Sequence, residues 1–272
     1  MGEDILPDTY RCASCGFYSS MFVARINSGE RIDEEKRNRA LRPIRIASFN
    51  QLLNDCAPWI PPGGSILDVG SAHGWFIAAA KHRGYRCIGV EPDEKMALQS
   101  RLEGHDAIIG FFPDAIAPGD SFDAITFNDV LEHMPNPNGV LTAVWRRLRT
   151  DGLVIISLPL SSGLIFTLAR FAAKIGVEAP LARLWQRGLP SPHMSYFNAT
   201  NLKTLMELHG FTQEICRPLR SFAIGGLYKR ITYDRGLSRP KALILYCLAL
   251  AIALIANFTP ADTCYFIFRK RA

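Results

Sequence analysis

Short apolar runs alternate with segments of helical periodicity through the middle of the chain. The segments between the runs place apolar residues three and four positions apart, which is typical of amphipathic helices. Strands and helices that alternate at short intervals predict a parallel, doubly wound sheet whose strand carboxyl ends meet at one edge, where the ligand binds. The expected strands are residues 66–69, 86–90, 107–111, 122–128 and 153–159, and the expected helices are residues 44–59, 75–81, 95–103, 139–148 and 199–210.

The two ends of the chain depart from this alternation. Residues 1–43 are polar and charged and lack apolar periodicity, so we expect a loosely ordered N-terminal arm ahead of one α/β domain over residues 44–272. Two apolar stretches interrupt the domain and are expected to be helical insertions, at residues 160–192 and 223–260. A chain of 272 residues is long enough for one good core with such extensions.

A turn without large apolar side chains, residues 70–74, connects the first expected strand of the sheet to a helix. Free N–H groups and the dipole at a helix N-terminus favour an anionic group, and small residues let a ligand approach the backbone. Dinucleotide sites use the spacing G-x-G-x-x-G, which cannot be laid over Gly70-Ser71-Ala72-His73-Gly74. The turn is either a nucleotide-type site with a different glycine spacing or an ordinary strand-to-helix connection.

The second expected strand ends at an acidic residue, Glu91, which Pro92 follows. Glu91 lies 23 residues after Asp68, close to the ~20 residues typical of an acid that accepts hydrogen bonds from ribose hydroxyls. Jointly with the turn, this acid predicts a nucleoside lying across the first two strand tips. An NAD-dependent oxidoreductase stays open as an alternative, although the glycine spacing opposes it.

The pattern Asp68-x-Gly70-x-Ala72-x-Gly74 resembles motif I, D-x-G-x-G-x-G, of the class I S-adenosylmethionine-dependent methyltransferases. Ala72 stands where the motif has its middle glycine, and the turn is expected to form if Ala72 keeps φ below zero. Residues 129–137, Asp-Val-Leu-Glu-His-Met-Pro-Asn-Pro, resemble the D-V-L-E-H-x-x-x-P segment of ubiquinone-biosynthesis-like and related small-molecule methyltransferases. The resemblance is dense over residues 44–160 and looser over 193–271.

The resemblance implies a Rossmann-like, doubly wound, seven-stranded sheet whose last strand, residues 263–268, is antiparallel. It also implies S-adenosylmethionine as the cofactor, covered by the helix over residues 44–59. The methionine end is expected to contact Asp68 and the backbone of Gly70, Ser71, Ala72 and Gly74. The ribose is expected at Glu91 and Pro92, and the adenine rim near Phe112 and Asn128.

The acceptor side of the site rests on fewer residues. Histidine has an unperturbed pKa near neutrality, so His133 could take a proton from a hydroxyl acceptor, or it could brace the turn at Pro135. Glu132 and His133 resemble a pair that binds a divalent metal in some quinone O-methyltransferases, and whether this chain needs a metal stays open. His193-x-x-Tyr196-Phe197 is similar to a signature of the family that covers the substrate, and a structural role for His193 and Tyr196 is equally open.

Residues 242–258 form a run of 17 residues without a charge. As a helix the run would be about 25 Å long against a hydrocarbon core of about 30 Å, which is marginal for a transmembrane span. A single crossing would also separate the strand at 263–268 from its sheet. A helix packed on the domain, a re-entrant hairpin and a helix at the bilayer surface stay open, and a true span returns if residues 263–268 lie outside the sheet.

Charge favours the bilayer surface among these alternatives. The formal net charge is +6 with an isoelectric point near 9.0, and residues 162–177 form an amphipathic segment. Contact with anionic lipid is favoured by the basic residues near the apolar run, namely Lys229, Arg230, Arg235, Arg239 and Lys241. Basic residues are not interleaved with aromatic ones, so we expect no nucleic-acid partner.

Seven scattered cysteines indicate a reducing compartment rather than a disulfide framework. The N-terminus carries acids and no apolar region, so we expect the chain to begin in the cytoplasm. Cys12-Ala-Ser-Cys15 looks like one knuckle of a zinc ribbon, but a closed structural zinc site needs four ligands and no second knuckle follows.

These observations favour a methyltransferase that acts on oxygen, or less readily on nitrogen or carbon, of a small or lipid-linked acceptor such as a quinone precursor, glycan or lipid. Expected contact with the cytoplasmic membrane surface favours the lipid-linked acceptor. The competing interpretation is a non-catalytic protein that keeps the fold and binds the cofactor or docks at a membrane. Ala72 is the feature of the turn that favours it.

Overall fold

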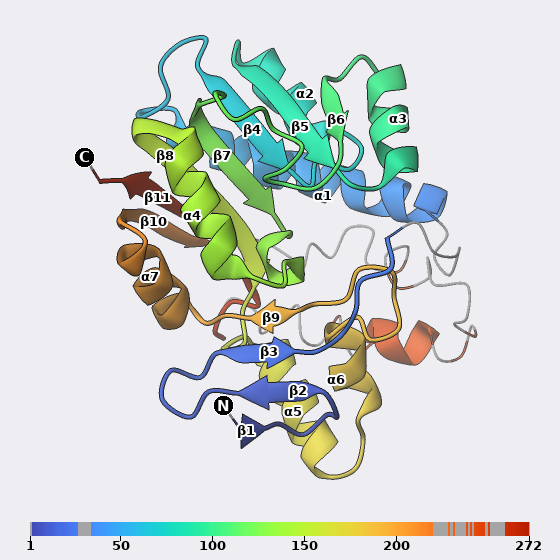
Figure 1. Cartoon of the computed structure of the whole chain (residues 1–272). Helices are drawn as coiled ribbons and strands as arrows, with labels where there is room; N and C mark the ends of the chain where they lie inside the picture. The colour runs from blue at the N-terminus through green and yellow to red at the C-terminus, as the bar shows by residue number, and fades with distance from the viewer. Residues whose placement is uncertain are drawn as a thin grey trace.

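A seven-stranded sheet forms the centre of the molecule (Figure 1). The structure, a computed structural model, describes residues 2–26, 34–219 and 259–271 together with positions 228, 231, 238, 240, 242–247 and 250. The strands follow the order β10-β11-β8-β7-β4-β5-β6, and β11 is antiparallel to both of its neighbours. Their bounds are β4 Ser65–Val69, β5 Arg86–Glu91, β6 Ala107–Ile109, β7 Phe122–Asn128, β8 Leu148–Pro159, β10 Phe211–Pro218 and β11 Thr263–Lys270. The predicted Rossmann-like sheet with an antiparallel last strand is confirmed.

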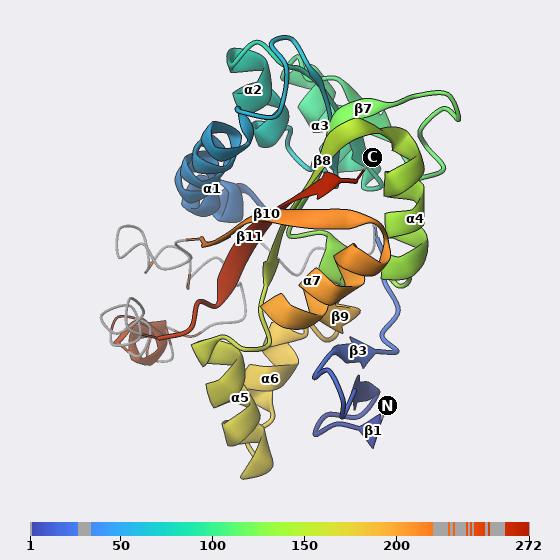
Figure 2. The same cartoon turned by 90° about the vertical axis from the view of Figure 1, so that its left-hand side faces the viewer.

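Helices cover both faces of this sheet (Figure 2). On one face α1 and α2 pack against buried residues that include Ile66 and Tyr265, and on the other α4 and α7 pack against residues that include Leu67 and Phe266. Adjacent residues of one strand thus enter opposite cores, which is why the central strands are mostly apolar on both faces. The helices are α1 Glu34–Cys56, α2 Trp75–His82, α3 Glu94–Leu102, α4 Pro137–Arg147 and α7 Ala199–Leu208.

The N-terminal residues form strands, so the prediction of a loosely ordered arm is wrong. The strands β1 Gly2–Glu3, β2 Thr9–Arg11 and β3 Tyr18–Ser20 join β9 Ser195–Tyr196 in a second, antiparallel sheet. Tyr18 pairs with Tyr196, a partner from the far half of the chain. Strands of two or three residues are too short to give a periodic pattern, and their stability comes from this distant partner.

The predicted insertion after β8 contains the helices α5 Leu164–Lys174 and α6 Ala179–Leu184. These helices pack against the small sheet around a third core that includes Leu6, Phe166 and Trp185. We call the small sheet, α5 and α6 the cap, since Figure 1 shows them below the carboxyl edge of the large sheet. An ion pair between Arg170 and Asp4 joins α5 to the N-terminal segment at 2.9 Å.

The second predicted insertion, residues 223–260, lies mostly outside the described residues. Residues 242–247 within it are helical. Every helix in the described part of the chain is too short or too polar to cross a bilayer.

Candidate functional site

The turn after β4 alternates left-handed backbone positions. Gly70, Ala72 and Gly74 have φ of 71°, 44° and 72°. The expectation that Ala72 keeps φ below zero is wrong. The turn forms with a positive φ at Ala72, as it would with the glycine of the motif, in spite of the Cβ of Ala72. A non-glycine residue in this region is strained by about 1–2 kcal/mol.

Close packing explains why two of the three positions are glycine. A Cβ built on Gly70 would lie 2.5 Å from Cγ2 of Val130, and one built on Gly74 would lie 2.4 Å from Oγ of Ser100. Gly74 is also the N-cap of α2, where no side chain caps the helix. The turn therefore brings bare backbone and an uncapped helix N-terminus to the carboxyl edge of the sheet.

Glu91 ties the second strand to this turn. One carboxylate oxygen accepts a hydrogen bond from the N–H of Ala72 at 2.8 Å, and the other accepts one from the N–H of Asp93 at 2.9 Å. Burial raises the pKa of Glu91, and the two N–H donors oppose that shift. Each oxygen keeps acceptor capacity for a ribose hydroxyl, so the carboxylate lies in the crevice where the sequence predicts it.

Asp68 lies under the same crevice at 2% exposure. Burial raises the pKa of Asp68 to about 8, a hydrogen bond from Asn128 opposes the shift and the charge of Glu91 adds to it. Nδ2 of Asn128 donates to Asp68 at 3.1 Å, while Oδ1 of Asn128 has no hydrogen-bond partner in the described part of the chain. The structure thus places Asp68 and Asn128, both predicted cofactor residues, next to each other. It leaves Oδ1 of Asn128 as an acceptor atom for a ligand.

Three other predicted cofactor residues have mainly structural surroundings. Ser71 is buried, and its hydroxyl packs against Gly89, where an added Cβ would lie 2.3 Å away. Pro92 lies half-buried between Glu91 and the start of α3. Phe112 is buried with its ring edge-on to Phe127 at 5.9 Å.

A cavity of about 230 Å³ lies between α1 and the carboxyl ends of β7 and β8. Asn128, Ser157 and Thr263 line it, together with an ion pair between Arg45 of α1 and Asp129. Sequence reasoning did not predict Arg45 in the site, since its position in α1 alone gives no sign of the partner.

A second cavity of about 160 Å³ lies under the cap, next to the first. Its lining is almost entirely apolar and includes Leu160, Phe166 and Tyr196. Thr263 lines both cavities, and its β8 partner Pro159 lines the second. A chamber with a mixed polar and apolar lining at the strand tips thus adjoins an almost entirely apolar chamber under the cap.

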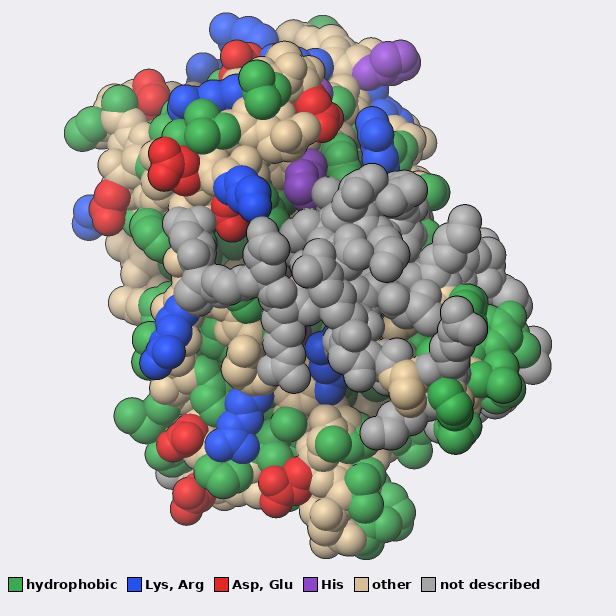
Figure 3. Space-filling view, turned by 90° about the vertical axis from the view of Figure 1, so that its right-hand side faces the viewer, with side chains coloured by type: hydrophobic (Ala, Val, Ile, Leu, Met, Phe, Trp, Pro, Cys, Tyr) green, Lys and Arg blue, Asp and Glu red, His purple; other side chains and the backbone are tan. Residues whose placement is uncertain are grey.

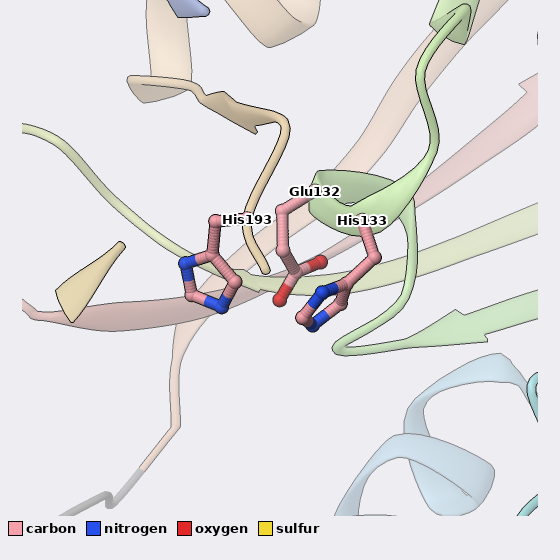
Figure 4. A group of neighbouring side chains, drawn as sticks. All are labelled: Glu132, His133 and His193. Atoms are coloured by element: carbon pink, nitrogen blue, oxygen red, sulfur yellow. The ribbon is translucent and has the colours of Figure 1, made fainter. Parts of the chain in front are cut away.

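Three predicted acceptor-side residues, Glu132, His133 and His193, lie close together (Figure 4). Glu132 and His133 belong to a short 3-10 helix, η1 Leu131–His133, that follows β7, and His193 comes from the loop before β9. The ring centroids of His133 and His193 are 4.6 Å apart. Burial lowers the pKa of His193 well below its ordinary value, with the charge of His133 acting in the same direction.

Tyr196 is held by the cap. Its hydroxyl donates to the backbone oxygen of Leu184 at 2.8 Å, and its ring lies 5.0 Å from that of His193. Burial raises the pKa of Tyr196 well above its ordinary value, and the charge of Glu132 adds to the shift. These contacts position the loop that carries His193.

Cys12 and Cys15 lie on the N-terminal hairpin between β2 and β3. Within the described residues, no third metal-ligating side chain joins them in a cluster. Sγ of Cys12 contacts Oγ of Ser14 at 3.1 Å instead.

Comparison with known proteins shows the same fold and the same kind of domain. Residues 35–214 match the methyltransferase domain family. An uncharacterised methyltransferase of Mycobacterium leprae strain Br4923 is 33% identical over 130 residues, which cover 44% of this chain and 46% of that protein. The ubiquinone biosynthesis O-methyltransferase of Xanthomonas oryzae is 29% identical over 162 residues, which cover 57% of this chain and 63% of that protein. The chain thus spans less than two thirds of either relative.

Among solved structures, the mycolic acid cyclopropane synthase CmaA1 complexed with SAH and CTAB has a TM-score of 0.61. Its sequence identity to this chain is 15%, and the match covers 89% of this chain and 90% of that one. At this identity the likeness shows the fold alone.

The sheet order, the glycine turn and the acid at the end of β5 are those of a class I S-adenosylmethionine-dependent methyltransferase fold. The family match covers more than half of the chain. The chain therefore belongs to the methyltransferase domain family, and S-adenosylmethionine is its cofactor.

Proposed function

We propose that the protein transfers the methyl group of S-adenosylmethionine to a hydroxyl oxygen of a lipid-linked small acceptor. The observation that carries this proposal is the adjacency of two chambers at the strand tips, one lined by Asn128 together with polar and apolar side chains, the other almost entirely apolar and under the cap. The sulfonium methyl is already activated, so the protein has to align the acceptor oxygen with it and exclude water. The O–CH3 bond forms as the S–CH3 bond breaks, and the hydroxyl proton leaves to a base.

The cofactor roles follow the predicted residues. Asp68 would receive the α-amino group of the methionine end, and the uncapped N-terminus of α2 would receive its carboxylate. The carboxylate of Glu91 would accept hydrogen bonds from the ribose hydroxyls. Support comes from the shared crevice, in which Glu91 accepts from the N–H of Ala72 in the glycine turn.

The acceptor roles rest on the residues beside the chambers. His133 is our candidate for the base that takes the hydroxyl proton, because it lies directly after β7 at the strand tips. His193 and Tyr196 would cover the acceptor from the cap. The Xanthomonas oryzae relative is named as an O-methyltransferase of ubiquinone biosynthesis, which supports oxygen as the methylated atom and a lipid-linked acceptor.

The cofactor half of the proposal is tested with S-adenosylmethionine binding by calorimetry. Glu91→Ala is expected to weaken binding by about 100–10,000-fold, the loss of two hydrogen bonds to a charged group. Glu94→Ala is the matched control, since Glu94 is an exposed acid at the start of α3. Absence of wild-type binding at high micromolar concentration would instead favour the non-catalytic alternative.

The acceptor half is tested with methyl-labelled S-adenosylmethionine and a cell extract divided into organic and aqueous fractions. Label is expected in the organic fraction with wild-type protein and not with Glu91→Ala, and mass spectrometry of the product identifies the methylated atom. Label confined to the aqueous fraction would contradict a lipid-linked acceptor while leaving methyl transfer intact.

A further inference from the structure

Three metal-ligating side chains from two separate segments meet at the carboxyl edge of the sheet. Glu132 and His133 follow β7, and His193 lies 60 residues further along the chain. One ligand atom from each of the three lies within 4.8 Å of the other two. Figure 4 shows the carboxylate of Glu132 lying between the two imidazole rings.

The carboxylate of Glu132 is buried without compensation. The residue is 1% exposed, and neither carboxylate oxygen has a hydrogen-bond partner in the described part of the chain. A buried carboxylate without hydrogen-bond partners is strongly unfavourable, and a bound cation would compensate its charge. Two neighbouring side chains are committed elsewhere, as Arg45 pairs with Asp129 and the Tyr196 hydroxyl donates to Leu184. Nδ1 of His193 is itself buried without a hydrogen-bond partner among the described residues.

The two histidines are held in place by neighbouring groups, as metal-ligating histidines usually are. Nδ1 of His133 lies 3.0 Å from the backbone oxygen of Pro192 and 3.2 Å from Oγ of Ser191. Nε2 of His193 lies 2.9 Å from the side-chain amide of Gln186. The partners fix both rings, and they come from the same loop that brings His193 to the sheet.

We propose that Glu132, His133 and His193 bind one divalent transition-metal ion of the Zn²⁺ type. Two imidazoles and one carboxylate are a donor set that suits first-row transition ions, and three protein ligands leave a coordination position open for substrate. When bound, such an ion would polarise an acceptor oxygen. This role rests on the proposed methyl transfer, whereas metal binding itself does not.

With the ion present, His133 is a ligand and is not available as the base. His193 provides the third donor atom, from the side of the Glu132 carboxylate opposite to His133. The cap is therefore part of the metal site, and its docking on the large sheet assembles the ligands.

The test is a Co²⁺ titration of the full-length, metal-free protein, followed by the visible absorption of the ion. Cys12→Ser and Cys15→Ser are introduced first, so that the thiolates of this cysteine pair cannot bind Co²⁺. We expect one Co²⁺ per chain, displacement by Zn²⁺, and a higher melting temperature with either ion, because a ligand that binds the folded state stabilises it.

Glu132→Gln and His193→Ala, each in the Cys12→Ser, Cys15→Ser parent, are expected to weaken binding by about 100-fold or more and to abolish the rise in melting temperature. Glu132→Gln keeps the shape of the side chain and removes the unpaired charge, so its metal-free form should melt no lower than the parent. It remains informative if His193→Ala fails to fold. His82→Ala removes an exposed histidine of α2 and should bind like the parent.

Equal Co²⁺ binding by the parent and Glu132→Gln would overturn the proposal, as would no binding by the parent. Neither result depends on methyl transfer, and S-adenosylmethionine binding is measured separately. Failure of the metal site and failure of the proposed function are therefore distinguishable.

Discussion

Ala72 holds a backbone conformation that the glycine of the motif would adopt without strain. Its φ is 44°, and its N–H donates to Glu91, so the conformation is imposed by the crevice. We expect Ala72→Gly to raise the free energy of unfolding by about 0.5–1 kcal/mol, since the relief of strain exceeds the added flexibility of the unfolded chain.

Urea denaturation measures this difference, with Ala79→Gly as the control. Ala79 lies inside α2, where glycine should destabilise by about 0.5–1 kcal/mol. A destabilised Ala72→Gly variant would show that the turn is not strained in solution.

Asp68 makes folding stability depend on pH. The pKa of its carboxyl is 3.8 when unperturbed and about 8 when folded, so the folded state holds the extra proton between these values. The stability from Asp68 is therefore complete at low pH and is lost as pH rises through about 8. We expect the melting temperature of the cofactor-free protein to fall between pH 5 and pH 8, and to fall less in Asp68→Asn, which can still accept the hydrogen bond from Asn128.

Parallel slopes of melting temperature against pH in the two proteins would contradict the assignment to Asp68. Glu91 also has a raised pKa, so part of the slope should persist in Asp68→Asn.

At the scale of the elements, the cap depends on the N-terminal strands. Leu6 is fully buried in the core that α5 and α6 share with the small sheet. Leu6→Ala is expected to lower the free energy of unfolding by about 2–5 kcal/mol through lost burial and the cavity left behind. Leu208→Ala, at an 80% exposed position of α7, should change it by less than about 0.5 kcal/mol.

Urea denaturation again provides the measurement, and Co²⁺ affinity provides a second one. If the cap assembles the metal site, loosening it in Leu6→Ala should also weaken Co²⁺ binding. A Leu6→Ala protein as stable as the parent would mean that the N-terminal strands do not pack as described.

At the scale of the whole molecule, exposed apolar side chains gather on the cap and near it. On α5 and the loop after it, Phe171 is 64% exposed and Ile175 is 68% exposed, next to the exposed cation Lys174. Figure 3 shows hydrophobic side chains on the lower part of the molecule, with acidic and basic side chains among them. Residues 243–245 are exposed as well. Exposed apolar side chains beside a cation suit an anionic lipid surface, the contact that the sequence analysis expects.

We expect the protein to sediment with vesicles that contain anionic lipid and to do so less at high salt. Phe171→Glu with Ile175→Glu should reduce the bound fraction several-fold. Leu102→Glu with Leu208→Glu changes the charge equally at exposed positions outside the cap and serves as the control. Equal loss in both double variants would assign the binding to net charge and refute the apolar face.

The periodic part of the chain could be predicted because its signal is local. Runs such as 153–159 are almost entirely apolar, since both faces of the strand are buried. The glycine turn follows one such strand, and Glu91 ends its neighbour. Motif spacing therefore placed Asp68, Gly70 and Glu91 correctly at one edge of the sheet.

The same reasoning could not place residues whose partners are distant. The strands at residues 9–11 and 18–20 carry little pattern of their own and form because β9 pairs with them. Nothing near Arg45 indicates Asp129, and nothing near Glu132 indicates His193.

The sequence by itself predicted the parallel sheet from short-range periodicity, and its resemblance to a known family implied the antiparallel last strand and the candidate cofactor residues, because both signals lie in elements that adjoin along the chain. Only the tertiary structure decided that the N-terminus builds a cap and that a buried carboxylate meets two imidazoles beneath it. Those contacts close loops of many residues, and their free energy comes from burial shared between segments that no local pattern connects.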